Sequence, residues 1–172
     1  MKVELIGYPT EQDWLEVKRR ALVTIGKKPV TPPDAEWKRK MLRARHSPIR
    51  YLSFEFYLEV PYYVSVHLAR HVHAQPYVKS QRNDRQNEYD RNKAPQDTLV
   101  CMIWDVNGEE MMTIANKRLC RLADKATQAA VLSMCLQINA ACPEFAPFLV
   151  PLCEYRGGNC PEMFSCGMYP EG

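Results

Sequence analysis

The sequence predicts one domain that combines β-strands with α-helices. Residues 51–60 alternate apolar and polar side chains, as expected of a strand with one buried face. Other segments carry apolar residues at helical spacing, behind residues that favour helix starts. With 172 residues the chain can bury a core without disulfide bonds or metal ions. We expect a single domain over residues 1–150 and a cysteine-rich tail over residues 151–172.

The first half of the chain predicts two strands and two helices. An edge strand over residues 3–8 precedes a capping box, Thr10 to Asp13, which starts the first helix. Its apolar face carries Trp14, Val17, Ala21 and Leu22. A second helix runs from Asp34 to about Arg45, and we expect its lysines and arginines to face solvent. The strand over residues 51–60 follows, and its half-polar second face suits packing against another subunit or the border of a cleft.

The second half predicts two longer helices around a second strand. Pro61 opens a helix to about His73, and Pro76 ends it. Residues 81–97 form a polar loop, which at this length favours a functional role. A strand over residues 98–106 leads into a helix with Asn107 as its N-cap. The last helix runs from Asp124 to about Ala141, and coil rich in proline, glycine and cysteine follows it.

Bulk charge and hydropathy exclude two classes of partner. The net charge is +3 and the pI about 8.4, below the value of about 9 expected of a domain that binds nucleic acid through bulk charge. No apolar run approaches the roughly 18 residues of a membrane span. The N-terminus resembles a strand and a turn instead of a signal peptide. We therefore expect a cytoplasmic protein with neither a nucleic-acid nor a membrane partner.

Hydrogen-bond donors concentrate in residues 70–82, RHVHAQPYVKSQR. This density favours an anion site, most simply for a phosphate, over a core. The alternative is a solvated basic helix end. Asn107 and Arg118 are eleven residues apart, so they share one face of a helix about 16 Å apart. The pattern allows a phosphate-binding set in which five side chains converge: Arg70, Ser80, Arg82, Arg91 and Arg118. In the alternative, Arg118 pairs with Glu110 or Asp124.

Histidines and cysteines offer two candidate metal sites. His67 and His71 stand at i and i+4, but no carboxylate ligand accompanies them, and simple hydrogen bonding is the alternative. Near the C-terminus four thiolates can hold zinc or an iron–sulfur cluster. These four are Cys142, Cys153, Cys160 and Cys166. They lack a CxxC pair, so unligated thiols are the alternative reading.

Residues 45–150 resemble the flavin-dependent thymidylate synthases, also called thymidylate synthase complementing proteins. The family signature RHRxxSxNExSxR is matched at its opening Arg70-His71 and its closing Ser80-Gln81-Arg82. The turn His46-Ser47-Pro48 and the strand SFEFYLEVP resemble the segment that precedes this motif. The segment from Asn107 to Arg118 and the last helix are also similar to the family.

The resemblance implies an α+β fold with a mostly antiparallel sheet flanked by helices, assembled as a homotetramer with active sites between subunits. It implies reductive methylation of dUMP to dTMP, with methylenetetrahydrofolate and NADPH as co-substrates and FAD as the electron carrier. The matched positions imply flavin contacts by Ser47, Arg70, His71 and Asn107. They imply nucleotide contacts by Ser80, Gln81, Arg82, Arg91 and Arg118.

The centre of the motif departs from the family. Val72 replaces an arginine, Gln75 a serine, and Tyr77-Val78 an Asn-Glu pair. Each lost contact to a charged partner costs roughly 1.5–3 kcal/mol, and these departures fall on the flavin half of the implied site. Three functions therefore stay open: a divergent synthase, a nucleotide-binding homologue without methylation activity, and a hydroxymethyl transferase acting on another pyrimidine nucleotide.

Overall fold

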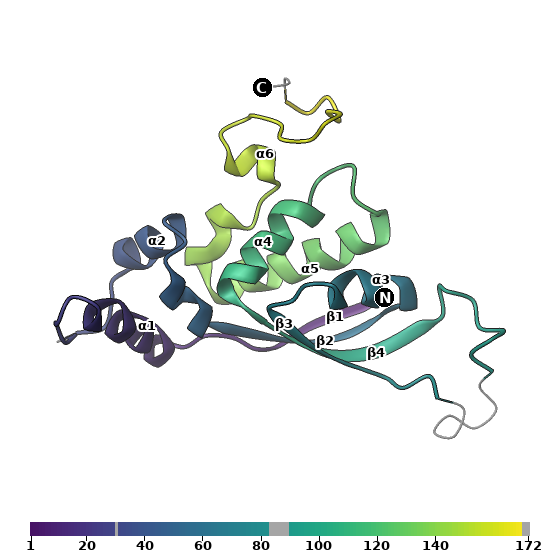
Figure 1. Cartoon of the computed structure of the whole chain (residues 1–172), viewed down its shortest axis with the longest axis horizontal. Coiled ribbons are helices and arrows are strands. Elements are labelled where there is room, and N and C mark those ends of the chain that lie inside the picture. Colours follow the sequence, from purple (N-terminus) through teal and green to yellow (C-terminus); the bar gives the residue numbers. More distant parts are fainter. Residues whose placement is uncertain (30, 83–89, 170–172) are drawn as a thin grey trace.

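A computed structural model describes residues 1–29, 31–82 and 90–169 of the chain. A four-stranded sheet carries helices on one side, and the C-terminal segment lies beyond those helices (Figure 1). In chain order the elements are β1 (Lys2–Gly7), α1 (Glu11–Val23), α2 (Ala35–Arg43), the 3-10 helix η1 (Ser47–Tyr51), β2 (Ser53–Pro61), α3 (Tyr62–Ala69), β3 (Ala74–Val78), β4 (Leu99–Asn107), α4 (Gly108–Arg118), α5 (Lys125–Ala141), the 3-10 helix η2 (Pro143–Phe148) and α6 (Leu152–Tyr155).

The sheet has the order β1-β2-β4-β3, and each neighbouring pair is antiparallel. In the central pair, Phe56 lies opposite Trp104 and both side chains are fully buried. The alternation expected over residues 51–60 is therefore present, with the even-numbered side chains in the core. The expected fold class, an α+β domain with an antiparallel sheet flanked by helices, is confirmed.

Helices α3, α4 and α5 lie on the same side of the sheet (Figure 1). Phe145, from η2, closes one end of this core, and its ring meets Phe54 edge-on with centroids 5.1 Å apart. Trp14 joins the same cluster from α1 and donates its indole N–H to Glu144 at 2.7 Å. The predicted apolar face of the first helix is confirmed, since Trp14 and Val17 are both buried.

Helix α4 follows β4 without a loop, as the sequence predicts. The Asn107 side chain accepts a hydrogen bond from the Glu110 N–H at 2.9 Å and caps the helix. At Gly108 the backbone N–H donates to the Leu52 carbonyl at 2.8 Å. A Cβ atom there would lie 3.1 Å from the Ile49 carbonyl, so glycine permits this close approach.

The helix predicted from Pro61 to about His73 is longer than the helix in the structure. Helix α3 ends at Ala69, and residues 74–78 form the edge strand β3 against β4. Pro76 is tolerated there because an edge strand has a ladder partner on one side only. Pairing with the edge of β4 overrides the local helical pattern. Strand β3 therefore separates the opening Arg70-His71 of the motif from its closing Ser80-Gln81-Arg82.

Two smaller predictions are also wrong. Lys38 of α2 does not face solvent: it is buried and pairs with Glu11 at 2.5 Å. The segment after Ala141 is not all coil, because η2 and α6 interrupt it.

Within the described ranges, no helix combines the length and apolar character that crossing a bilayer requires. Residues 83–89 of the expected polar loop, and 170–172 of the tail, lie outside the described residues.

Candidate functional site

A cavity of about 330 Å³ lies between α3 and the segment that follows β3. We call it the α3 cavity. Three of the five residues implied for nucleotide binding line it, namely Gln81, Arg82 and Arg91. The remaining lining residues are Tyr62, Ser65, Val66, Ala69, Val78 and Lys79. The volume falls in the range of roughly 300–1,000 Å³ that is typical of small-molecule sites.

One wall of this cavity is a face of α3. Its residues 62, 65, 66 and 69 stand at helical spacing, so they point to the same side. The Tyr62 N–H donates to the Thr98 carbonyl at 2.9 Å, which ties the start of α3 to the segment before β4. The buried Ser65 hydroxyl donates to the Tyr62 carbonyl at 2.7 Å. Its polar atom is therefore satisfied inside the helix, and this wall presents mainly carbon.

The opposite wall is cationic. Lys79 is held against the sheet, because its N–H donates to the Cys101 carbonyl at 2.8 Å. Arg82 and Arg91 add two more positive charges, and no acidic side chain lines the cavity among the described residues. Ser80 does not line it. Its hydroxyl accepts from the Arg82 N–H at 3.3 Å and so shapes the turn that carries the arginine.

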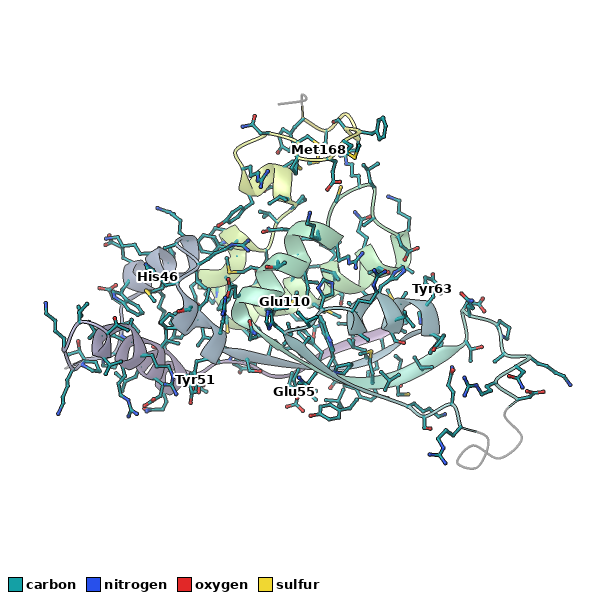
Figure 2. The ribbon with its side chains drawn as sticks, viewed as in Figure 1. His46, Tyr51, Glu55, Tyr63, Glu110 and Met168 are labelled. Atoms are coloured by element: carbon teal, nitrogen blue, oxygen red, sulfur yellow. The ribbon has the colours of Figure 1, made fainter. Side chains whose placement is uncertain are left out.

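A second group of residues gathers at α4, in what we call the α4 cluster. It contains the implied residues His71, Asn107 and Arg118, together with Glu110. His71 Nδ1 lies 2.9 Å from the Glu110 Oε1 atom. Glu110 points from α4 into the middle of the molecule (Figure 2). Burial lowers the pKa of His71, and the positive charges of Arg118 and Arg70 lower it further, against the opposing effect of Glu110. The imidazole is therefore neutral at pH 7.

The hydrogen-bonding state of this cluster follows from that neutral imidazole. An ionised carboxylate only accepts hydrogen bonds, so His71 Nδ1 carries the proton and Nε2 is an acceptor. His71 Nε2 and Arg118 Nε are both buried and have no hydrogen-bond partner among the described residues. Arg118 forms no ion pair with Glu110 or Asp124 there. The α4 cluster thus offers one buried acceptor and one buried donor.

The other implied residues lie apart from the α3 cavity. Arg70 caps the end of α3 and is exposed. Ser47, on η1, lines a separate cavity of about 330 Å³ together with Ala21, Thr24, Ile25, Met41, His46 and Pro48. Arg50 pairs with Glu109, which links η1 to the start of α4. The single chain therefore brings together Gln81, Arg82 and Arg91, but it does not add Arg70, Ser47 or Arg118 to them.

The two histidines of the candidate metal site contact different side chains. His67 Nδ1 lies 2.9 Å from the Thr127 hydroxyl, while His71 faces Glu110. The simpler reading, that both histidines are hydrogen-bonded side chains, describes what the structure contains. The Nδ1 atoms of the two rings therefore face different partners.

The cysteines divide into two groups. Cys142 is buried, and its thiol faces the Pro9 carbonyl. Cys153, Cys160 and Cys166 instead meet Cys120 around a cavity of about 20 Å³, which we call the cysteine cavity. The structure therefore separates Cys142, which belongs to the core, from the other three cysteines of the candidate set. In the part of the chain that the structure describes, no three His, Cys, Asp or Glu side chains are arranged to hold a metal ion.

Sequence reasoning missed three parts of these sites. Lys79 and Tyr62 line the α3 cavity, and Glu110 is the partner of His71. The spacing of residues 62, 65, 66 and 69 was a usable signal for the α3 wall. The His71–Glu110 contact joins residues 39 positions apart and leaves no local pattern. Two motif departures, Val72 and Tyr77, are largely exposed, while Val78 lines the α3 cavity.

No protein-family model matches the chain, and no curated protein matches its sequence. Solved structures do match its fold. A UMP/dUMP methylase PolB from Streptomyces cacaoi, bound with 5-Br dUMP, is 15% identical, with a TM-score of 0.67; the match covers 86% of this chain and 93% of that one. The same methylase bound with 5-Br UMP is 14% identical, with a TM-score of 0.63 and coverage of 87% and 95%. At this identity the likeness establishes a shared α+β fold.

Proposed function

We propose that the protein binds a pyrimidine nucleoside monophosphate in the α3 cavity and methylates its base, with dUMP converted to dTMP. The observation that carries this proposal is the grouping of Gln81, Arg82 and Arg91 around one cavity of suitable size. The fold similarity to a methylase solved with 5-Br dUMP and 5-Br UMP supports the same class of ligand. The match between the ends of the 70–82 motif and the synthase signature points the same way.

In this proposal the cationic wall holds the phosphate. Arginine presents paired N–H donors that match phosphate oxygens, and lysine adds a compact charge. Each charge-assisted hydrogen bond contributes about 1.5–3 kcal/mol. Lys79, Arg82 and Arg91 therefore offer a phosphate three cationic side chains around one cavity.

The proposed cofactor is FAD, with NADPH as reductant and methylenetetrahydrofolate as one-carbon donor. When bound, the flavin carries the hydride needed to bring the one-carbon unit to the methyl level. The α4 cluster fits such a group, because His71 Nε2 is a buried acceptor and Arg118 Nε a buried donor without partners among the described residues. A flavin ring edge carries both carbonyls and an N–H. Asn107 has less to offer, since its amide already caps α4 and contacts the His73 carbonyl.

The separation of the parts favours a site shared between chains. Gln81, Arg82 and Arg91 line the α3 cavity, while Ser47 lines another cavity and Arg118 lies in the α4 cluster. We therefore propose a homo-oligomer, a tetramer by resemblance, in which one chain supplies the nucleotide wall and another supplies α4 or η1. Mass photometry or light scattering of the purified protein tests this part directly.

Product mass tests the reaction. The purified protein is incubated with dUMP or UMP, methylenetetrahydrofolate, NADPH and FAD, and the nucleotide is analysed by mass spectrometry. We expect one methyl group in place of one hydrogen on the pyrimidine, and no product when FAD is omitted. A product with an additional oxygen indicates a hydroxymethyl transferase. Nucleotide recovered unchanged, although it binds, indicates a homologue without methylation activity.

A further inference from the structure

The α3 wall combines exposed apolar side chains with a cationic wall opposite. Tyr62 is 37% exposed, Val66 41% and Val78 36%, and all three line the same cavity. Large apolar side chains that are exposed side by side often mark a binding surface. Nothing on α3 needs this face for the core, since Val64 and Leu68 on the other face are fully buried.

The two walls differ in the chemistry they recognise. Lys79, Arg82 and Arg91 attract an anion, but they do not distinguish one phosphate ester from another. The α3 face presents the phenol ring of Tyr62 and aliphatic carbon, and the Ser65 hydroxyl is already bonded to the helix backbone. A ligand that satisfies both walls must carry a phosphate at one end and a flat, weakly polar ring at the other.

We propose that the α3 wall, with Tyr62 as its main contact, receives the nucleobase and makes the cavity selective for nucleotides over sugar phosphates. This inference rests on the proposed function of the same cavity and names residues outside the 70–82 motif. Stacking of a base on an aromatic ring contributes about 1–3 kcal/mol and tolerates different bases. Tyr62 therefore recognises the presence of a base, while the phosphate contacts supply the remaining affinity.

The fold fixes the position of Tyr62 beside the cavity. It is the first residue of α3, and its backbone N–H is anchored to the Thr98 carbonyl. The neighbouring Tyr63 turns away from the cavity and packs against His67, with ring centroids 6.1 Å apart. Figure 2 shows Tyr63 on α3, next to the segment that leads into β4, where its N–H donates to the Gln96 carbonyl at 3.2 Å. Two adjacent tyrosines thus serve different surfaces, and only the first faces the cationic wall.

The test compares three ligands on four proteins by isothermal titration calorimetry. The ligands are UMP, ribose 5-phosphate and inorganic phosphate, and the proteins are wild type, Tyr62→Leu, Tyr62→Phe and Tyr77→Ala. Tyr77 is 63% exposed on the neighbouring strand and does not line the cavity, so it is the matched control for losing a surface tyrosine. Tyr62→Leu keeps an apolar residue at the helix start, and far-UV circular dichroism with a thermal melt establishes that it is folded.

We expect wild type to bind UMP more tightly than ribose 5-phosphate. Tyr62→Leu should weaken UMP binding by roughly fivefold to a hundredfold and leave ribose 5-phosphate unchanged. Tyr62→Phe and Tyr77→Ala should match wild type. Equal affinities of wild type for UMP and ribose 5-phosphate, or an unchanged UMP affinity in folded Tyr62→Leu, would overturn the α3 wall and leave the phosphate site intact. Failure of wild type to bind any of the three ligands would overturn the proposed function as well.

Discussion

The α3 cavity and the cysteine cavity are both lined by residues that the sequence marks as candidates, but they differ in size and chemistry. The α3 cavity has a volume of about 330 Å³ and three cationic side chains. The cysteine cavity has a volume of about 20 Å³ and four thiols, from Cys120, Cys153, Cys160 and Cys166. A space of the second size holds one water molecule and excludes an organic ligand. Residue types alone suggested two candidate sites, but only the volume of the α3 cavity suits an organic ligand.

The two cavities also differ in how their residues are held. The α3 cavity lies where a helix, a strand edge and the connection after it meet the sheet. The cysteine cavity lies between the end of α4 and the tail, far from the sheet, where Figure 2 labels Met168. The tail turns at Gly157, Gly158 and Gly167, all with positive φ, and its Met163 and Phe164 side chains are almost fully exposed. The proposed ligand site belongs to the part of the fold that the core supports.

The largest expected effect comes from removing the charges of the α3 cavity. The double variant Arg82→Ala/Arg91→Ala should weaken UMP binding by at least about 1.5–3 kcal/mol, because charge-assisted hydrogen bonds to the phosphate are lost. Calorimetry measures the change. Arg121→Ala, which removes an exposed arginine from the cysteine cavity, is the matched control and should bind as wild type does. An equal loss of UMP affinity in Arg121→Ala would contradict the assignment of UMP to the α3 cavity.

Filling the α3 cavity should have the next largest effect. Ala69 is exposed and lines the cavity, so Ala69→Phe places a ring where the ligand would lie. We expect UMP affinity to fall by more than about 1.4 kcal/mol, a factor of ten, without a drop in melting temperature. Ala140→Phe, at an exposed position on α5, controls for the added ring. Retained UMP binding in Ala69→Phe would place the ligand elsewhere.

The α4 cluster should make the stability of the protein depend on pH. Burial lowers the pKa of His71 below its ordinary 6.5, so the unfolded chain takes up a proton more readily than the folded one. Stability from this group is therefore present above pH 6.5 and is lost as the pH falls toward the folded-state pKa, by less than about 1.4 kcal/mol per pH unit. Urea unfolding of wild type and His71→Gln, from about pH 7.5 down to about pH 5.5, measures the slope. Parallel curves for the two proteins would contradict this assignment.

Thiol labelling gives the smallest but most local comparison. Burial raises the pKa of Cys135 and of Cys142 to about 12, so both thiols stay protonated in the native protein. The four cysteines of the cysteine cavity are only half-buried. With iodoacetamide at about pH 8.5, they should be alkylated more than about tenfold faster than the two core thiols. Digestion and peptide mass mapping give the order in which the cysteines are alkylated. Early alkylation of Cys142 would contradict its placement in the core.

The sequence predicted those elements that local patterns determine. The alternation over residues 51–60 and the caps at Asn107 and Asp124 are present as expected, because period and capping chemistry act within a few residues. Strand β3 was missed, since its partner β4 lies more than twenty positions later in the chain. The burial of Lys38 was also missed, because it depends on Glu11 and Glu144 from other elements.

For the candidate site, sequence reasoning indicated the proposed phosphate contacts better than the proposed base contacts. Gln81 and Arg82 share one short segment, so a motif can indicate both together. Tyr62 and the apolar face of α3 belong to a helix that the sequence interpretation extended too far, and this hid which face borders the sheet edge. The pairing of His71 with Glu110, and the meeting of Cys120 with the tail, depend on tertiary packing alone.

The most direct test is a crystal structure of the protein with 5-bromo-dUMP, in which the anomalous signal of bromine marks the base independently of the phosphate. We predict the phosphate within hydrogen-bonding distance of Arg82 and Arg91, and the bromine signal in the α3 cavity beside Tyr62. A bromine signal at the α4 cluster or in the Ser47 cavity, with the α3 cavity empty, would contradict the assignment of the α3 cavity as the nucleotide site.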